Sequence, residues 1–155
     1  GGEPDSIVTI ERKQAYSDAL AELGLVEDPA AVKYGCFSAK GTKKRILEIA
    51  ETGVTAVVCI SDLLACTAVK ELIHAGYSVP EDISVTGYDN LPPSEDSQPP
   101  ITTLSQNRIH IGKTTFFMLQ QMKNGIRIKS LMLRPELIER ESVREICSRE
   151  LPKEK

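Results

Sequence analysis

The alternation of apolar and polar stretches along the chain predicts strands and helices in turn. Residues 55–60 are apolar throughout, as expected for a parallel strand that is covered on both faces. Residues 63–75 have helical spacing and stop at Gly76, and residues 83–87 form a second, weaker strand. This order predicts one βαβ unit with parallel strands and a right-handed crossover.

The flanking segments extend the same pattern. The sequence predicts helices over 10–23, 38–53 and 109–123, the last of them amphipathic. It predicts a short strand over 32–37, a short strand or extended connector over 101–105 and a final strand over 131–139. Residues 91–100, with four prolines, are predicted to form a loop, and residues 144–155 a charged tail. We therefore expect an α/β fold with an open, mostly parallel sheet flanked by helices.

Polar residues lie just beyond the two strands of the predicted βαβ unit. Ser61 and Asp62 follow the first strand, and Asp89 and Asn90 follow the second. In open α/β sheets, ligands bind outside the carboxyl ends of the strands, where helix N-termini and loop side chains converge. The pattern predicts a small-molecule crevice at this edge of the sheet.

The first predicted helix has no strand before it, although a helix in this architecture normally follows one. The chain also opens with Gly1 and Gly2 rather than with methionine. We expect the chain to begin partway into a fold.

Composition narrows the class of protein. With 155 residues, the chain can form one compact domain or a large piece of one. Its content of 41% hydrophobic and 26% charged residues is ordinary for a soluble globular protein. The net charge of −3 and the lack of a long basic block argue against nucleic-acid binding by this segment. No apolar run approaches the ~20 residues of a membrane span, and no signal peptide is visible.

The sequence predicts neither a metal site nor a cofactor, and no catalytic residues. No nucleophile elbow, P-loop or zinc-protease helix motif occurs. An aspartate at a strand end also suits a phospho-receiver domain, but we find no acidic pair or later lysine to complete that site. The cysteines form no CxxC motif and have no metal-like spacing to either histidine, so we interpret them as reduced residues that pack in the core: Cys36, Cys59, Cys66 and Cys147, with His74 and His110 isolated on helices.

Four blocks of the chain resemble one known family. They are TAVVCISDLLA (55–65), HAGYSVPEDISVTGYDN (74–90), PITTLSQ (100–106) and RPELIERESV (134–143). In order and spacing they are similar to the effector-binding region of the LacI/GalR-type (lactose/purine repressor) transcriptional regulators, along nearly the whole chain. The resemblance implies a periplasmic-binding-protein-like type I fold and a cytoplasmic regulator with two α/β subdomains that clasp a small effector.

The resemblance also implies which part of that fold is present. Residues 1–143 correspond to a C-terminal subdomain truncated at its N-terminus, with a crossover helix over 107–124 and a returning strand over 131–139, and residues 144–155 form a charged tail. The DNA-binding headpiece and most of the N-terminal subdomain are absent, so operator DNA is contacted only through that absent N-terminal domain, and no membrane is involved. In the family, the helix that corresponds to 109–123 packs on the N-terminal subdomain, which is absent. We therefore expect a homodimer, formed by self-association or exchange of elements, or a fragment of a longer protein.

The resemblance assigns ligand-binding roles to residues at the predicted crevice. Arg12 matches an arginine that forks onto effector hydroxyls or a carboxylate, although Ala15 replaces the usual glycine; it is otherwise a solvated helix residue. Asp89 matches an aspartate that accepts hydrogen bonds from sugar hydroxyls or a purine-type ligand, and it otherwise forms a turn. Ser61 and Asp62 match a small polar pair at the effector site, and Asp62 could equally be a helix N-cap. Phe37 matches an aromatic residue that stacks on the effector, or it is a core residue. Gln106 either contacts the ligand or hydrogen-bonds to the backbone.

These features predict the effector-sensing part of a LacI-type bacterial regulator. It would bind a sugar or purine-like metabolite and control DNA binding by the missing headpiece. One alternative is a periplasmic solute-binding protein of a transporter, which has the same fold class. The other is a small α/β enzyme or receiver domain.

Overall fold

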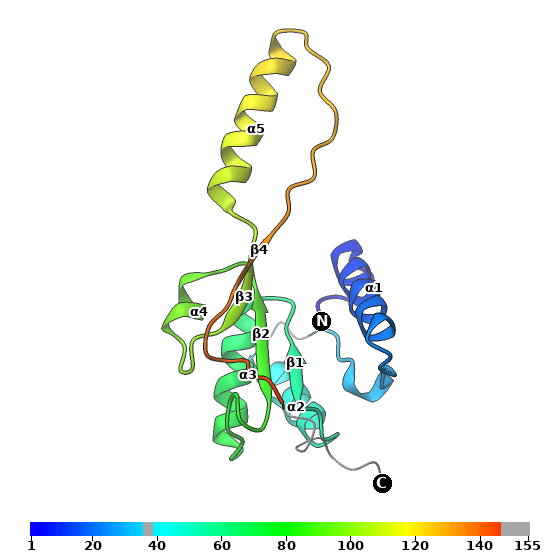
Figure 1. Ribbon diagram of the computed structural model, residues 1–155, viewed down its shortest axis with the longest axis vertical. Coiled ribbons are helices and arrows are strands. Elements are labelled where there is room, and N and C mark those ends of the chain that lie inside the picture. Colours follow the sequence, from blue (N-terminus) through cyan, green and yellow to red (C-terminus); the bar gives the residue numbers. More distant parts are fainter. Residues whose placement is uncertain (36–38, 147–155) are drawn as a thin grey trace.

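The computed structural model describes residues 1–35 and 39–146 of the chain, and a four-stranded sheet forms its centre (Figure 1). In spatial order the strands are β1 Ala56–Val58, β2 Ser84–Tyr88, β3 Thr102–Ser105 and β4 Glu136–Ile138. Strands β1, β2 and β3 are parallel, and β4 runs antiparallel to β3. The open, mostly parallel sheet that the sequence predicts is confirmed.

The chain also forms helices, most of which flank this sheet (Figure 1). In the described residues they are α1 Ile7–Glu22, the 3-10 turn η1 Pro29–Ala31, α2 Ala39–Ala50, α3 Asp62–His74, α4 Pro92–Asp96 and α5 Arg108–Lys123. Helix α3 packs against α2 and β2, and α1 stands beside the β1 edge (Figure 1). Within residues 1–35 and 39–146, no helix has the length and apolar content that crossing a membrane requires.

The core lies between the sheet and α3. Val57 of β1 and Val85 of β2 are buried under that helix. On α3 the buried apolar positions recur with helical spacing, at Ala65, Ala68, Val69 and Leu72. The βαβ unit therefore forms as predicted, because its apolar residues lie on matching faces of the helix and the strands.

Three predicted segments differ in the structure. The proline-rich loop contains α4, since the missing N–H of proline is no loss in the first turn of a helix. Residues 32–35 contain no strand, and the Gly35 N–H donates to the Gly2 backbone oxygen (2.8 Å) instead. The final strand is confined to β4, because Pro135, which has no N–H for a ladder, directly precedes it.

Helix α5 projects away from the sheet (Figure 1), and none of its residues is buried. Phe116 is 64% exposed and Phe117 59% exposed. Successive helical residues point about 100° apart, so Phe116, Phe117 and Leu119 face different directions. The predicted amphipathic character is wrong, because the apolar residues surround the helix axis.

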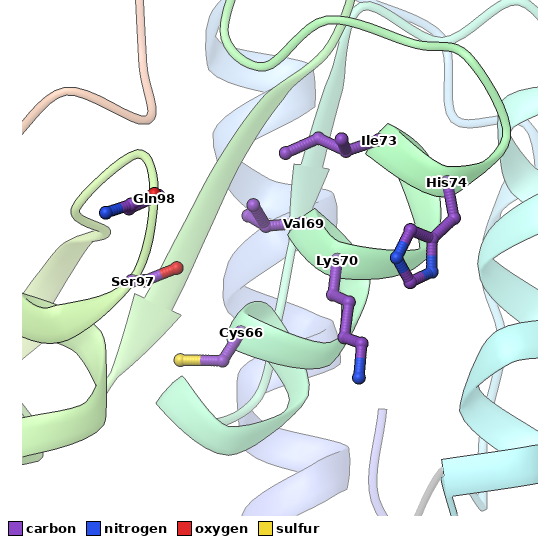
Figure 2. A pocket seen from close by; sticks show the side chains of 7 residues that line it. All are labelled: Cys66, Val69, Lys70, Ile73, His74, Ser97 and Gln98. Carbon is purple, nitrogen blue, oxygen red and sulfur yellow. The ribbon is translucent and has the colours of Figure 1, made fainter.

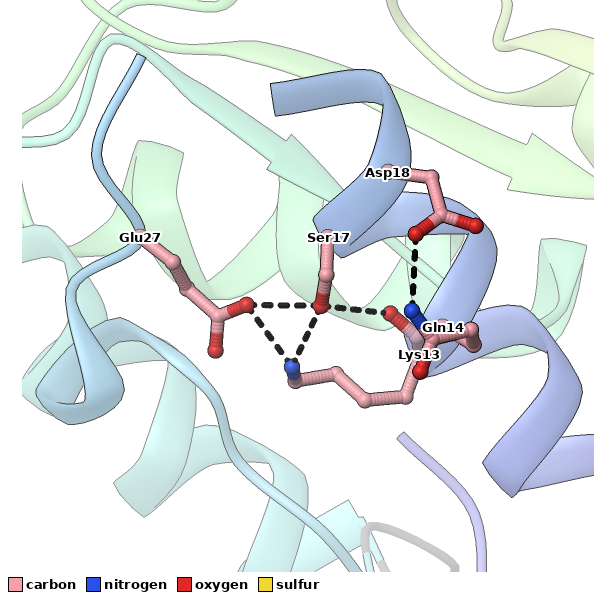
Figure 3. A network of polar contacts seen from close by, with 5 residues as sticks. All are labelled: Lys13, Gln14, Ser17, Asp18 and Glu27. Atoms are coloured by element: carbon pink, nitrogen blue, oxygen red, sulfur yellow. Dashed lines mark hydrogen bonds and ion pairs between the residues drawn. The ribbon is translucent and has the colours of Figure 1, made fainter. Parts of the chain in front are cut away.

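A polar network fastens the segment after α1 to the helix (Figure 3). Lys13 Nζ lies 2.8 Å from Glu27 Oε2, and the Ser17 hydroxyl donates to the same carboxylate oxygen (2.8 Å). The hydrogen bond from Lys13 lowers the pKa of Glu27, and the same bond raises the pKa of Lys13. The network thereby holds Glu27, in the segment after α1, against the helix.

Candidate functional site

The three parallel strands end at one edge of the sheet, and a polar side chain lies shortly beyond each. Ser61 follows β1, Asp89 follows β2 and Gln106 follows β3. The carboxyl ends of neighbouring parallel strands share an edge, which is where open α/β sheets bind ligands. We call these three residues, together with Arg12 of α1, the rim.

The Arg12 guanidinium lies between two strand ends. Its Nη1 donates to the backbone oxygen of Ile60 (2.6 Å), and its Cζ lies 3.7 Å from the centroid of the Tyr88 ring. A cation over an aromatic face gains about 0.5–2 kcal/mol from the ring quadrupole. Ile60 adjoins Ser61 and Tyr88 adjoins Asp89, so Arg12 lies beside both strand ends.

Asp89 and Gln106 are joined directly. Gln106 Nε2 donates to Asp89 Oδ1 (2.8 Å), and the Asp89 N–H donates to the Leu104 backbone oxygen (2.8 Å). Asp89 has a left-handed φ of 104°. The turn therefore holds one carboxylate oxygen on Gln106, while the described residues supply no hydrogen-bond donor to the other.

Ser61 begins α3. Its Oγ accepts from the Leu64 N–H (3.4 Å), as an N-cap does. The hydroxyl proton remains available as a donor at the rim. Beside it, the guanidinium of Arg12 supplies donors and the carboxylate of Asp89 supplies an acceptor. This combination matches a small polar molecule with several hydroxyl or ring-nitrogen groups.

The structure places Asp62 in neither predicted role. The N-cap is Ser61, and the Asp62 side chain is 0% exposed. Its Oδ2 accepts from the Leu91 N–H (2.6 Å) and its Oδ1 from the Thr103 hydroxyl (2.6 Å). Both oxygens are therefore engaged inside the protein, below the rim.

Of two aromatic residues near the site, the sequence predicted one, Phe37, and not the other, Tyr88. Phe37 lies outside the described residues. Tyr88, which sequence reasoning missed, supplies the ring on which Arg12 stacks. Its position directly before Asp89 at a strand end was the only available signal, since a contact between α1 and β2 is visible only in the folded chain.

A groove of about 660 Å³ opens between α1 and the β1 side of the sheet. Arg12 and Tyr88 line part of it, so the groove reaches the rim. Among the described strands, β1 pairs with β2 alone. Most of the remaining lining is apolar and comes from several elements, including Tyr16, Ala19, Ile46, Ile49, Val54 and Val58.

The model of one family, the periplasmic binding protein-like domain, matches residues 2–143. The chain belongs to this family. Among similar proteins, the HTH-type transcriptional repressor PurR of Aliivibrio fischeri (strain MJ11) is 34% identical over 148 residues, which are 92% of this chain and 44% of that protein. The HTH-type transcriptional repressor CytR of Escherichia coli (strain K12) is 33% identical over 137 residues, 86% of this chain and 40% of that protein.

Solved structures lead to the same group. The transcriptional regulator CelR in its cellobiose complex is 32% identical, with a TM-score of 0.81 over 92% of this chain and 45% of that one. The Lac repressor dimer bound to operator and the anti-inducer ONPF is 27% identical, with a TM-score of 0.81 over 92% of this chain and 50% of that one. The predicted LacI/GalR-type effector-binding domain is thereby confirmed, and the chain spans less than half the length of the curated relatives it matches.

A second hollow, of about 210 Å³, shares no residue with the rim of this LacI-type domain. It lies between α3 and the segment after α4 (Figure 2). Cys66 borders it and donates through Sγ to the Pro93 backbone oxygen (3.3 Å). Burial raises the pKa of the Cys66 thiol, and the charge of Asp62 adds to this effect. Because the thiolate is the reactive form, this cysteine is poorly suited to nucleophilic chemistry near neutral pH.

Among the described residues, no group of three or more His, Cys, Asp or Glu side chains is placed to hold a metal ion. The relatives named above are transcriptional repressors and regulators, not enzymes by name.

Proposed function

We propose that this chain is the effector-sensing part of a LacI-type bacterial transcriptional regulator. The observation that carries the proposal is the position of Arg12. Its guanidinium bonds to Ile60 and stacks on Tyr88, which brings it beside Ser61 and Asp89. Donors from a helix and acceptors from strand ends thus meet at one edge of the sheet.

The effector that this site suits is a sugar or a nucleobase-like metabolite. Asp89 offers an acceptor to hydroxyl or N–H groups, while Arg12 and Ser61 offer donors to oxygen or ring nitrogen. The CelR structure was solved with cellobiose, which is a neutral sugar rich in hydroxyl groups. Tyr88 already stacks on Arg12, so polar contacts rather than stacking on this ring would select the ligand.

The working regulator is larger than this chain. In our proposal, residues 1–143 form one side of a two-sided crevice, with residues 107–124 and 131–139 crossing to the other side and residues 144–155 as a charged tail. Effector binding closes the crevice of a homodimer in the cytoplasm and changes the affinity of a separate headpiece for operator DNA. Such a switch requires the effector to bind the two arrangements with different affinity.

The curated relatives favour this proposal over a periplasmic solute-binding protein, because the ones named above are transcriptional repressors. An enzyme or receiver domain has no comparable support from the geometry. Of the two aspartates that could accept a phosphoryl group at a strand end, Asp62 is fully buried with both oxygens hydrogen-bonded. The other, Asp89, accepts a hydrogen bond from Gln106.

A ligand screen tests the proposal. Sugars, including cellobiose, and free nucleobases are added to the longest soluble form of the regulator that contains this chain, and thermal unfolding is followed. A ligand at about 100 times its Kd adds about 2.7 kcal/mol of stability, which is readily seen as a rise in Tm. The 155-residue chain alone should respond more weakly, because it supplies one side of the crevice.

The control pair is Asp89→Asn and Glu95→Gln, where Glu95 is an exposed residue of α4. Each variant exchanges a carboxylate for an amide. We expect Asp89→Asn to abolish the rise in Tm and Glu95→Gln to retain it. A screen without any hit, or a hit that binds both variants equally, would contradict the proposed function.

A further inference from the structure

One buried carboxylate connects the three strand ends of the rim. Asp62 opens α3, directly after Ser61, and is 0% exposed. It accepts from the Leu91 N–H beyond β2 and from the Thr103 hydroxyl of β3, both at 2.6 Å. Burying a carboxylate is costly unless its oxygens are hydrogen-bonded. This side chain therefore specifies where the neighbouring segments must lie.

The turn that Asp62 holds is an unusual one. Asp89 and Asn90 both have positive φ, at 104° and 51°. Non-glycine residues in that region cost of the order of 1 kcal/mol or more each, and they persist only where the surroundings hold them. Asp89 is the rim residue whose carboxylate faces Gln106, so the shape of this turn decides where that carboxylate points.

Each N–H of the turn is anchored. The Asp89 N–H donates to the Leu104 backbone oxygen (2.8 Å). The Asn90 N–H donates to the Thr103 hydroxyl oxygen (3.4 Å), and that hydroxyl donates in turn to Asp62. The Leu91 N–H donates to Asp62 directly. Two of the three anchors thus end on the same carboxylate.

Asp62 also lies against the strand that leads into the turn. A Cβ atom added at Gly87 would come within 2.2 Å of Asp62 Oδ1 and 3.2 Å of its Cα. Gly87 immediately precedes Tyr88 and Asp89. The carboxylate therefore contacts β2 one residue before the Tyr88 ring, as well as the turn that follows.

We propose that Asp62 is a positioning residue of the effector site, one that does not touch the effector. It holds the β2 turn so that the Tyr88 ring lies under Arg12 and the Asp89 carboxylate meets Gln106. The importance of this role for sensing rests on the proposed function, but the geometry itself can be measured without any ligand.

Amide hydrogen exchange, followed by NMR on the 155-residue chain, tests the inference. Asp62→Asn keeps the size of the side chain but places an NH2 donor where two donors converge, so one of them loses its acceptor. We expect exchange at Asn90 and Leu91 to accelerate by about tenfold or more relative to the core amides of β2. The side-chain NH2 signals of Gln106 should shift as well, because its partner Asp89 moves.

Ser142→Ala is the matched control. Ser142 is also 0% exposed; its Oγ donates to the Val85 backbone oxygen (2.6 Å) and accepts from the Thr102 N–H (2.9 Å). Removing it breaks buried hydrogen bonds in the same sheet but outside the turn. Stability should fall, while exchange at Asn90 and Leu91 should keep its ratio to that of the core.

A second pair keeps the test usable if Asp62→Asn fails to fold. Thr103→Val removes the hydroxyl that links Asn90 to Asp62, whereas Thr103→Ser retains it. We expect faster exchange at Asn90 in the valine variant and near-normal exchange in the serine variant. Equal behaviour of the two variants would overturn the role of the hydroxyl.

The outcomes separate this inference from the proposed function. If exchange in Asp62→Asn rises uniformly over the chain, or does not change at Asn90 and Leu91, Asp62 is not a positioning residue. In that case the ligand screen keeps its own meaning. If the turn loosens as expected but no sugar or nucleobase binds the unaltered protein, the proposed function fails while the positioning role stands.

Discussion

At the scale of single residues, the rim is organised before any ligand arrives. Arg12 is held by a backbone oxygen and an aromatic ring, and Asp89 by Gln106. A guanidinium has five N–H donors in a fixed plane, so the bond to Ile60 leaves several for an effector. Side chains held in this way lose little conformational entropy on binding, which favours affinity.

Arg12→Lys tests this view because it keeps the charge and removes the planar fork. We expect the affinity for an effector found in the screen to fall by about tenfold, or about 1.4 kcal/mol, as measured by isothermal titration calorimetry. Glu11→Gln, a change at the exposed neighbouring residue, should leave the affinity unaltered. Equal affinities of Arg12→Lys and the unaltered protein would remove Arg12 from the site.

At the scale of elements, the close approach of α3 to β2 depends on the absence of a side chain at one position. Gly87 lies against the first residue of α3, with no room for a Cβ atom. The apolar residues of α3 then pack on the sheet in register with this contact. The packing of α3 on β2 therefore also determines where the residues of the rim lie.

Two glycine substitutions separate packing from helix propensity. Gly87→Ala should destabilise the chain by about 1–3 kcal/mol, because the new methyl group must displace the Asp62 carboxylate or the β2 backbone. Gly112→Ala in α5 meets open space and should instead stabilise by up to about 1 kcal/mol, from helix propensity. Urea unfolding measures both changes. A neutral Gly87→Ala would show that α3 and β2 can move apart freely.

At the scale of the whole molecule, large apolar surfaces lack cover among the described residues. Helix α5 has apolar residues on all sides and buries none of them. A helix of this kind is normally enclosed by other structure. The groove beside β1 is a second such surface. Both agree with a chain that spans less than half the length of its curated relatives.

We expect these surfaces to make the isolated chain self-associate. Sedimentation velocity over a range of concentrations should show a rising weight-average mass. Replacing both Phe116 and Phe117 with glutamate should lower that mass, whereas two new carboxylates at exposed polar positions of the same helix, in Gln120→Glu and Lys113→Glu, should have a smaller effect. A chain that stays monomeric at every concentration would refute this expectation.

Much of the fold was predictable because its signals are local. The apolar run before Ser61, the helical spacing of α3 and the glycine stop after it need only near neighbours in the chain. Two predictions failed because they depend on contacts between distant parts of the chain. The backbone at 32–35 forms no strand and bonds to Gly2 instead, and the position of Asp62 depends on partners 29 and 41 residues away.

The sequence by itself determined the order of strands and helices, the family resemblance and the polar residues that follow each strand. These properties are carried by periodicity and by short motifs, which do not depend on distant contacts. Only the tertiary structure decided that Arg12 stacks on Tyr88, that Ser61 rather than Asp62 caps α3, and that Asp62 is enclosed. The stacking of Arg12 and the enclosure of Asp62 depend on which groups meet across strands and helices. The cap itself is a local contact, and it falls to Ser61 while the Asp62 carboxylate is engaged by Leu91 and Thr103.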